Sequence, residues 1–161
     1  MKLKFRGNDL IVFLDKKEID KINFNNRFEL EKYFRTLFIK IKSIYSIDFK
    51  GSYNITIYVD KKIGIILEVC GEDTEYFEYD DDIIDMNLKK KDDEFIFKVD
   101  NIGSLSGKFD FYLHDNDIYV VPFNLNYIDI GILFENSTLI YGEERRKIMN
   151  DLSLIKLDKI W

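Results

Sequence analysis

The chain has 161 residues, a formal net charge of -6 and a hydrophobic fraction of 46%. This composition excludes a disordered chain, and the length suffices for one ordinary domain or two small ones. The negative net charge argues against a nucleic-acid or anionic-membrane partner, because proteins bind such partners through clustered Lys and Arg.

The first half of the chain predicts a strand, a helix and a hairpin, in that order. Residues 10–14 form an apolar run of strand length. Asn26 can cap a helix, and Glu29, three residues later, can return a hydrogen bond to the capping amide. Apolar residues then alternate along 53–59 and 63–69 around a polar turn, which is typical of a hairpin. We expect this sheet to cover the apolar stripe of the helix, which comprises Leu30, Phe34, Leu37, Ile41 and Ile44.

Residues 72–85 form the most acidic stretch of the chain. They include eight carboxylates in fourteen positions and no basic residue. Repulsion among like charges favours an extended, solvated segment. We therefore predict an acidic linker over residues 72–93, between a first unit at 1–71 and a second unit at 94–161.

The second half predicts a further mixture of strands and helices. Apolar residues alternate over 95–99 and on both sides of a turn at 115–117, which predicts an entry strand and a second hairpin. A single helical turn is expected at 102–105, and helical spacing at 125–132 and 142–152 predicts two more helices. The expected fold class is α+β, with two small units that each contain a short antiparallel sheet and one or two packed helices.

Few residues favour a catalytic or metal site. Cys70 and His114 are the single cysteine and the single histidine, and they fall in different predicted units, which argues against a Cys/His nucleophilic pair. The chain has no glycine-rich phosphate loop and no zinc-ligand set, and the acids at 80–85 lack the spacing of an EF-hand. The sequence therefore predicts a non-enzymatic protein without a cofactor or a metal.

The sequence also favours a cytoplasmic protein. A lone cysteine forms no internal disulfide, which fits a reducing compartment. No window approaches the ~20 apolar residues that a membrane helix needs. The apolar run at 10–14 is too short for a signal sequence. We therefore expect no membrane partner.

Five segments resemble a known family when they are taken in order. They are LIVFLDKKEIDKINF, FKGSYNITIYVDKKIGIILEV, EFIFKVDNIGSLSGKF, FYLHDNDIYVVPF and YGEERRKIMND. Together they cover nearly the whole chain and resemble the MecA family of adaptor proteins for Clp-type AAA+ unfoldases. The chain departs from that family in a shorter linker and at residues 135–140, where the family usually has a longer glycine-containing connection and another strand.

The resemblance implies a division of labour between the two units. The N-terminal unit would capture a client regulator, and the C-terminal unit would dock on a Clp-type unfoldase for regulated proteolysis. Neither step would involve covalent chemistry by this chain, and the acidic linker would raise the effective concentration of the client at the unfoldase.

The candidate protein-binding residues are aromatic or basic. The aromatic residues of the acidic stretch can either anchor a partner or cover a sheet edge, and the arginines of the final helix form either a solvated face or a partner contact. The candidates are Tyr76, Phe77, Tyr79, Tyr119, Tyr141, Arg145 and Arg146.

Two other functional classes remain open at this point. The net charge and the run Asp80–Asp82 are consistent with a small acidic inhibitor or immunity protein that blocks a basic partner. An enzyme would have to rely on Cys70, His114 and scattered carboxylates, and a pocket with convergent ionisable residues would be its mark.

Overall fold

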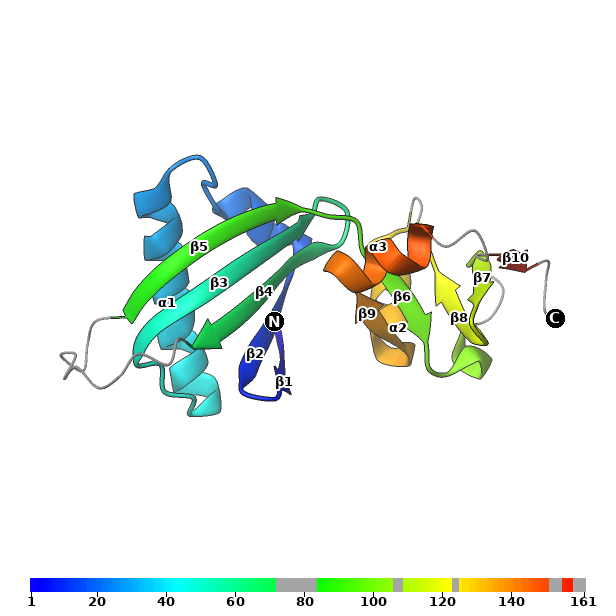
Figure 1. The fold of residues 1–161 in the computed structure, drawn as a ribbon, viewed down its shortest axis with the longest axis horizontal. Coiled ribbons are helices and arrows are strands. Elements are labelled where there is room, and N and C mark those ends of the chain that lie inside the picture. Colours follow the sequence, from blue (N-terminus) through cyan, green and yellow to red (C-terminus); the bar gives the residue numbers. More distant parts are fainter. Residues whose placement is uncertain (72–83, 106–108, 123–124, 151–154, 158–161) are drawn as a thin grey trace. The chain divides into compact units, whose positions relative to one another are not determined.

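The computed structural model describes residues 1–71, 84–105, 109–122, 125–150 and 155–157 (Figure 1). The chain divides into two compact units, Met1–Asp92 and Asp93–Trp161. Each unit has its own sheet and its own helices. The predicted α+β class in two units is therefore confirmed.

Unit 1 is a five-stranded sheet with one long helix (Figure 1). The strand order is β1-β2-β4-β3-β5, and every pair is antiparallel except β3 and β5, which are parallel. In chain order the elements are β1 (Lys2–Arg6), β2 (Asp9–Asp15), the 3₁₀ helix η1 (Lys16–Lys21), α1 (Arg27–Tyr45), β3 (Gly51–Asp60), β4 (Gly64–Gly71) and β5 (Ile84–Asp92).

The helix α1 begins where the sequence predicts. The Asn26 side chain accepts a hydrogen bond from the Glu29 amide at 3.2 Å, which satisfies one of the open N–H groups of the first turn. The second half of the predicted capping box is wrong, because the Glu29 carboxylate accepts a hydrogen bond from the side chain of Asn23 instead. The helix ends at Ser46, which adopts the left-handed conformation with φ 56°.

One face of the sheet packs against α1 and forms the core of unit 1. Alternate residues of β2, β3 and β4 are buried together with the apolar stripe of the helix, as the period-two and period-3.6 patterns require. Ile44 was predicted to belong to that stripe but is 56% exposed, because the helix has nearly reached its end there.

Gly64 fixes the turn between β3 and β4. Its φ is +150°, and a Cβ at this position would lie 2.2 Å from the carbonyl oxygen of Leu14 on the neighbouring strand. Only glycine tolerates that approach, so the hairpin and its pairing with β2 depend on this residue.

The predicted acidic linker at 72–93 is wrong in its second part. Residues 84–92 form β5, which pairs with β3 over nine residues and belongs to unit 1. Residues 72–83 lie outside the described residues; they connect β4 to β5 within unit 1 and do not join the two units. The boundary between the units falls at Asp92 and Asp93, so an acidic tether does not separate them.

Both edge strands of this sheet carry several cations. The outward side chains of β1 include Lys2, Lys4 and Arg6, and those of β5 include Lys89 and Lys91. Lysines on an edge strand oppose pairing with a strand of another chain. The local basic run of β5 therefore has a structural explanation.

Unit 2 contains a second sheet, with the strand order β10-β7-β8-β6-β9 and all pairs antiparallel. Its described elements are β6 (Ile96–Val99), the 3₁₀ helix η2 (Ile102–Ser104), β7 (Phe111–His114), β8 (Asp117–Val120), α2 (Tyr127–Asn136), β9 (Ser137–Ile140), α3 (Gly142–Asn150) and β10 (Ile155–Leu157). The turn between β7 and β8 has positive φ at Asp115 and Asn116, which matches the twist of a tight hairpin.

The two helices of unit 2 pack on opposite faces of its sheet. Ile96 and Ile140 point to the face that α3 covers with Ile148. Phe97, the next residue along β6, points to the other face and meets Phe134 of α2 edge-on, with ring centroids 5.3 Å apart. Residues 135–140, where the comparison with the MecA family predicts that a strand is missing, include β9.

None of the described helices is long and apolar enough to cross a membrane.

Candidate functional site

Among the candidate binding residues that the structure describes, most have contacts inside their own unit. Tyr76, Phe77 and Tyr79 lie outside the described residues. Tyr119 is 4% exposed and belongs to the core cluster under α3. Its ring is therefore not an exposed anchor in this structure.

The candidates near α3 are engaged in contacts within unit 2. Arg145 donates a hydrogen bond from Nη2 to Glu94 Oε2 at 3.1 Å, and the neighbouring carboxylate of Asp93 accepts one from the Gly142 amide at 2.6 Å. These two bonds tie the start of α3 to the segment before β6. Tyr141 packs edge-on against Phe95. Only Arg146 is largely solvent-facing, and it pairs with Glu143 one turn earlier at 2.9 Å.

Cys70 and His114 lie in different units, as the sequence indicates. Burial raises the pKa of the Cys70 thiol, and the neighbouring Asp9 carboxylate raises it further. This shift is opposite to the one that activates a nucleophilic cysteine. His114 is buried beside Tyr119, with its Nε2 3.3 Å from Asp115 Oδ2.

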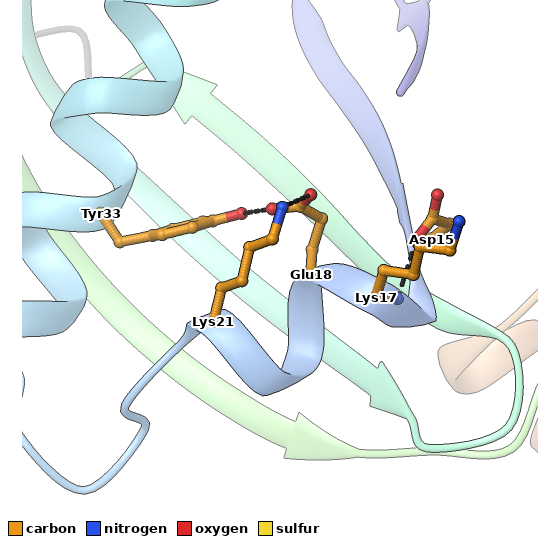
Figure 2. Close-up of polar contacts among 5 residues, drawn as sticks. All are labelled: Asp15, Lys17, Glu18, Lys21 and Tyr33. Carbon is orange, nitrogen blue, oxygen red and sulfur yellow. Dashed lines mark hydrogen bonds and ion pairs between the residues drawn. The ribbon is translucent and has the colours of Figure 1, made fainter.

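A polar cluster in unit 1 joins η1 to α1 (Figure 2). Glu18 accepts a hydrogen bond from the Tyr33 hydroxyl at 2.5 Å and one from Lys21 Nζ at 2.9 Å. Asp15 begins η1 by accepting a hydrogen bond from the Lys17 amide at 2.8 Å. Figure 2 shows Tyr33 reaching from the helix to the carboxylate of Glu18. Sequence reasoning missed this cluster, because residues 15 apart in the chain give no periodic signal.

A cavity of about 230 Å³ adjoins this cluster. Its lining combines aliphatic and ionisable side chains, from Met1, Leu14, Asp15, Glu18, Tyr33, Thr36, Leu37 and Lys40. The hydrogen bond from Tyr33 lowers the pKa of Glu18, with help from Lys21. Burial, followed by the bond to Glu18, raises the pKa of Tyr33.

The directions of these pKa shifts favour a structural role for the cluster. A general acid or base works best with a pKa near the operating pH. The pKa of Glu18 is lowered and the pKa of Tyr33 is raised, so both move further from neutral pH. Glu18 therefore stays a carboxylate and Tyr33 stays a neutral phenol. The pair is therefore a fixed hydrogen bond that positions η1 against α1.

The solvent-facing side of α1 presents an unusual set of side chains, which we call the α1 stripe. It comprises Phe28, Lys32, Arg35, Ile39 and Lys42. They follow at steps of four and three residues and so share one side of the helix. That side is opposite the buried side, which carries Leu30, Phe34, Leu37, Phe38 and Ile41.

The α1 stripe combines exposed apolar groups with cations. Phe28 is 76% exposed and Ile39 is 69% exposed. Within the described residues, Lys32 and Arg35 form no ion pair, whereas Lys42 contacts Asp48 at 2.9 Å. The sequence signal for the stripe was the pair of large apolar residues that fall outside the core period, and it was overlooked.

No metal centre is evident in the described part of the chain, where no three His, Cys, Asp or Glu side chains gather closely enough to hold an ion. The chain matches no protein-family model, no curated protein and no solved structure. The resemblance to the MecA family therefore stays a prediction from the order of its segments.

Proposed function

We propose that this chain is a non-catalytic, cytoplasmic adaptor of the MecA kind, which delivers a client regulator to a Clp-type AAA+ unfoldase for regulated proteolysis. Unit 1 binds the client and unit 2 docks on the unfoldase. The observation that carries the proposal is the division into two units, each with its own sheet and helices. Two separately built units suit a protein that holds two partners at once.

The surfaces of the two units support different contacts. Unit 1 exposes large apolar side chains on α1, which is where a client would bury area. Unit 2 exposes the charged outer face of α3, with Arg146 among its residues. An arginine on a rigid helix is a common contact in protein interfaces.

The test is the ATPase rate of the Clp-type unfoldase from the same organism, with and without the full chain. The proposal predicts faster ATP hydrolysis and a shared peak on a sizing column. Arg146→Glu should weaken both effects, because it replaces a cation by an anion at the proposed contact with the unfoldase. Loss of its pair with Glu143 costs the helix only about 0.2–0.5 kcal/mol, so the variant should stay folded.

The matched control is Lys61→Glu, which reverses one exposed charge in the β3–β4 turn of unit 1. This variant should stimulate the ATPase as the unmodified chain does. If the unmodified chain neither forms the complex nor changes the ATPase rate, the adaptor proposal is wrong.

A further inference from the structure

We propose that the α1 stripe is the docking surface for an acidic amphipathic helix of a protein partner. This inference deepens the proposed function, because it names the chemistry of the client that unit 1 would hold. It rests on the exposure, the charge and the spacing of five residues on one helix.

The charge of the α1 stripe is opposite to that of the whole chain. The whole chain carries 30 acidic and 24 basic residues, yet the stripe contains two cations without an acidic partner among the described residues and no acid. The helix as a whole carries more basic than acidic residues. Of its two acids, Glu31 is paired with Arg27, whereas Glu29 accepts a hydrogen bond from the neutral Asn23 amide and keeps its charge. An acidic partner is therefore attracted here, although most of the chain repels it.

The apolar groups of the α1 stripe lie toward its two ends. Phe28 and Ile39 lie eleven residues apart, which is about three helical turns, and the cations Lys32 and Arg35 lie between them. A partner therefore needs two apolar anchors separated by carboxylates. An amphipathic helix offers that arrangement, since its apolar residues recur every three or four positions and residues i and i+11 lie on the same side. The stripe from residue 28 to residue 42 spans ~21 Å, long enough for about four turns of such a helix.

A second copy of this chain fits the stripe poorly. In a two-fold contact each surface faces itself. An antiparallel pair of α1 helices centred on Arg35 would place this arginine beside its own copy, and a parallel pair would also align Lys32 with its copy. Like charges in such contact are destabilising.

An anionic membrane is also a poor fit. Interfacial helices bury a broad apolar face and carry their cations along its borders. Here the broad apolar face of α1 is buried against the sheet, and the solvent side offers two separated apolar groups. The net charge of -6 further opposes approach to an anionic surface.

The experiment uses the full chain and two synthetic peptides of about 18 residues, enough for five turns of helix. The acidic peptide carries Leu at positions i, i+4, i+7 and i+11, so that its first and last Leu match the spacing of Phe28 and Ile39, with Glu elsewhere. The basic peptide keeps the same Leu positions and replaces every Glu by Lys. Binding is measured by fluorescence anisotropy at physiological salt, and the site is mapped by amide chemical shifts of the isotopically labelled chain. Vesicles containing phosphatidylserine serve as the membrane probe.

The inference predicts that the acidic peptide binds and shifts the α1 amides of the stripe, and that the basic peptide binds at least about tenfold more weakly, as expected for charge-selected contacts. Lys32→Glu combined with Arg35→Glu should lower the affinity for the acidic peptide by about the same factor and raise the affinity for the basic peptide. Phe28→Ser combined with Ile39→Ser should lower the affinity for both peptides. The control pair, Lys4→Glu with Lys61→Glu, makes the same charge change at exposed sites outside α1 and should leave the α1 shifts in place.

Three outcomes would overturn the inference. They are equal binding of both peptides, amide shifts confined to residues outside α1, and binding to vesicles without binding to the acidic peptide. The proposed function fails separately, through the unfoldase assay. An ATPase response without peptide binding would support the adaptor function and contradict the docking surface. Peptide binding without an ATPase response would support the docking surface and contradict the adaptor function.

Discussion

Tyr33→Phe tests whether the hydrogen bond between α1 and η1 stabilises unit 1. The substitution keeps the aromatic ring and removes the hydroxyl that donates to Glu18 at 2.5 Å. A hydrogen bond to a charged group contributes roughly 1.5–3 kcal/mol. Because Glu18 is partly exposed, solvent screening reduces that value. We expect a loss of about 1–2 kcal/mol in the free energy of unfolding near pH 7.

The pH dependence of this loss follows from the two pKa shifts. The pKa of Glu18 is lowered, so its contribution is present above the ordinary carboxyl pKa and disappears as the pH falls through the folded value. The pKa of Tyr33 is raised, so its contribution is present below the ordinary phenol pKa and disappears as the pH rises through the folded value. The difference in the free energy of unfolding between the unmodified chain and Tyr33→Phe should be largest between roughly pH 5 and pH 9. It should shrink as the pH falls below that range.

The assay is urea unfolding followed by circular dichroism, with hydrogen exchange of the α1 amides to assign the change to unit 1. A loss of 1 kcal/mol lowers the melting temperature of a domain of 60–100 residues by about 4–8 °C. Tyr45→Phe is the matched control, because Tyr45 is an exposed tyrosine at the end of the same helix. If Tyr33→Phe were no less stable than Tyr45→Phe at pH 7, the proposed role of the hydrogen bond would be refuted.

Three further substitutions test the fold. Gly64→Ala should destabilise unit 1 by about 3 kcal/mol or more, because its Cβ would lie 2.2 Å from the Leu14 carbonyl; a normal urea midpoint would show that the turn adjusts freely. Asn26→Ala should cost about 1 kcal/mol through loss of the hydrogen bond to the Glu29 amide, measured by thermal unfolding, and no change would mean that this cap is dispensable. Substituting the outward lysines of β5, within residues 89–91, by Val should leave the fold intact but increase light scattering at high concentration, whereas unchanged scattering would contradict their role as edge protection.

The elements of unit 1 that the sequence predicted well are those with one clear period. In α1, apolar residues recur every three or four positions from Leu30 to Ile41, and the capping residue Asn26 precedes them. In β3 and β4 the core-facing aliphatic residues recur at every second position, although Tyr58 and Ile66 between them are buried as well. Local geometry and burial favour the same structure in these segments, so the pattern alone is enough.

The strand β5 was missed because two signals compete in its sequence. Ile84, Met86 and Leu88 alternate in the way of a strand, and Met86 is buried in the core. The acids that precede them and the lysines that follow predict a solvated segment when charge is weighed first. Pairing with β3 over nine residues decides in favour of the strand, and that partner is 33 residues away in the chain. Single-sequence periodicity contains no information about such pairing.

The polar cluster and the α1 stripe illustrate two different limits of sequence reasoning. The contact between Glu18 and Tyr33 depends on how η1 folds back onto the helix, which no short-range pattern encodes. Phe28 and Ile39, in contrast, are visible in the sequence as large apolar residues on the wrong side of an amphipathic helix. The apolar period that marks the core side of the helix does not include these two residues.

The cost of keeping Phe28 and Ile39 exposed bears on why they are there. Burying a side chain of this size contributes roughly 1.5–3 kcal/mol, but both residues leave most of their surface in water, so unit 1 gains little stability from them. Single exposed apolar residues are common on protein surfaces. Two of them on one side of one helix form a more specific surface, because Lys32 and Arg35 lie between them without an ion pair among the described residues and the nearby Glu31 is paired with Arg27. Because the fold gains little from these apolar groups, a partner that buries them and neutralises the cations is the better physical explanation for the α1 stripe.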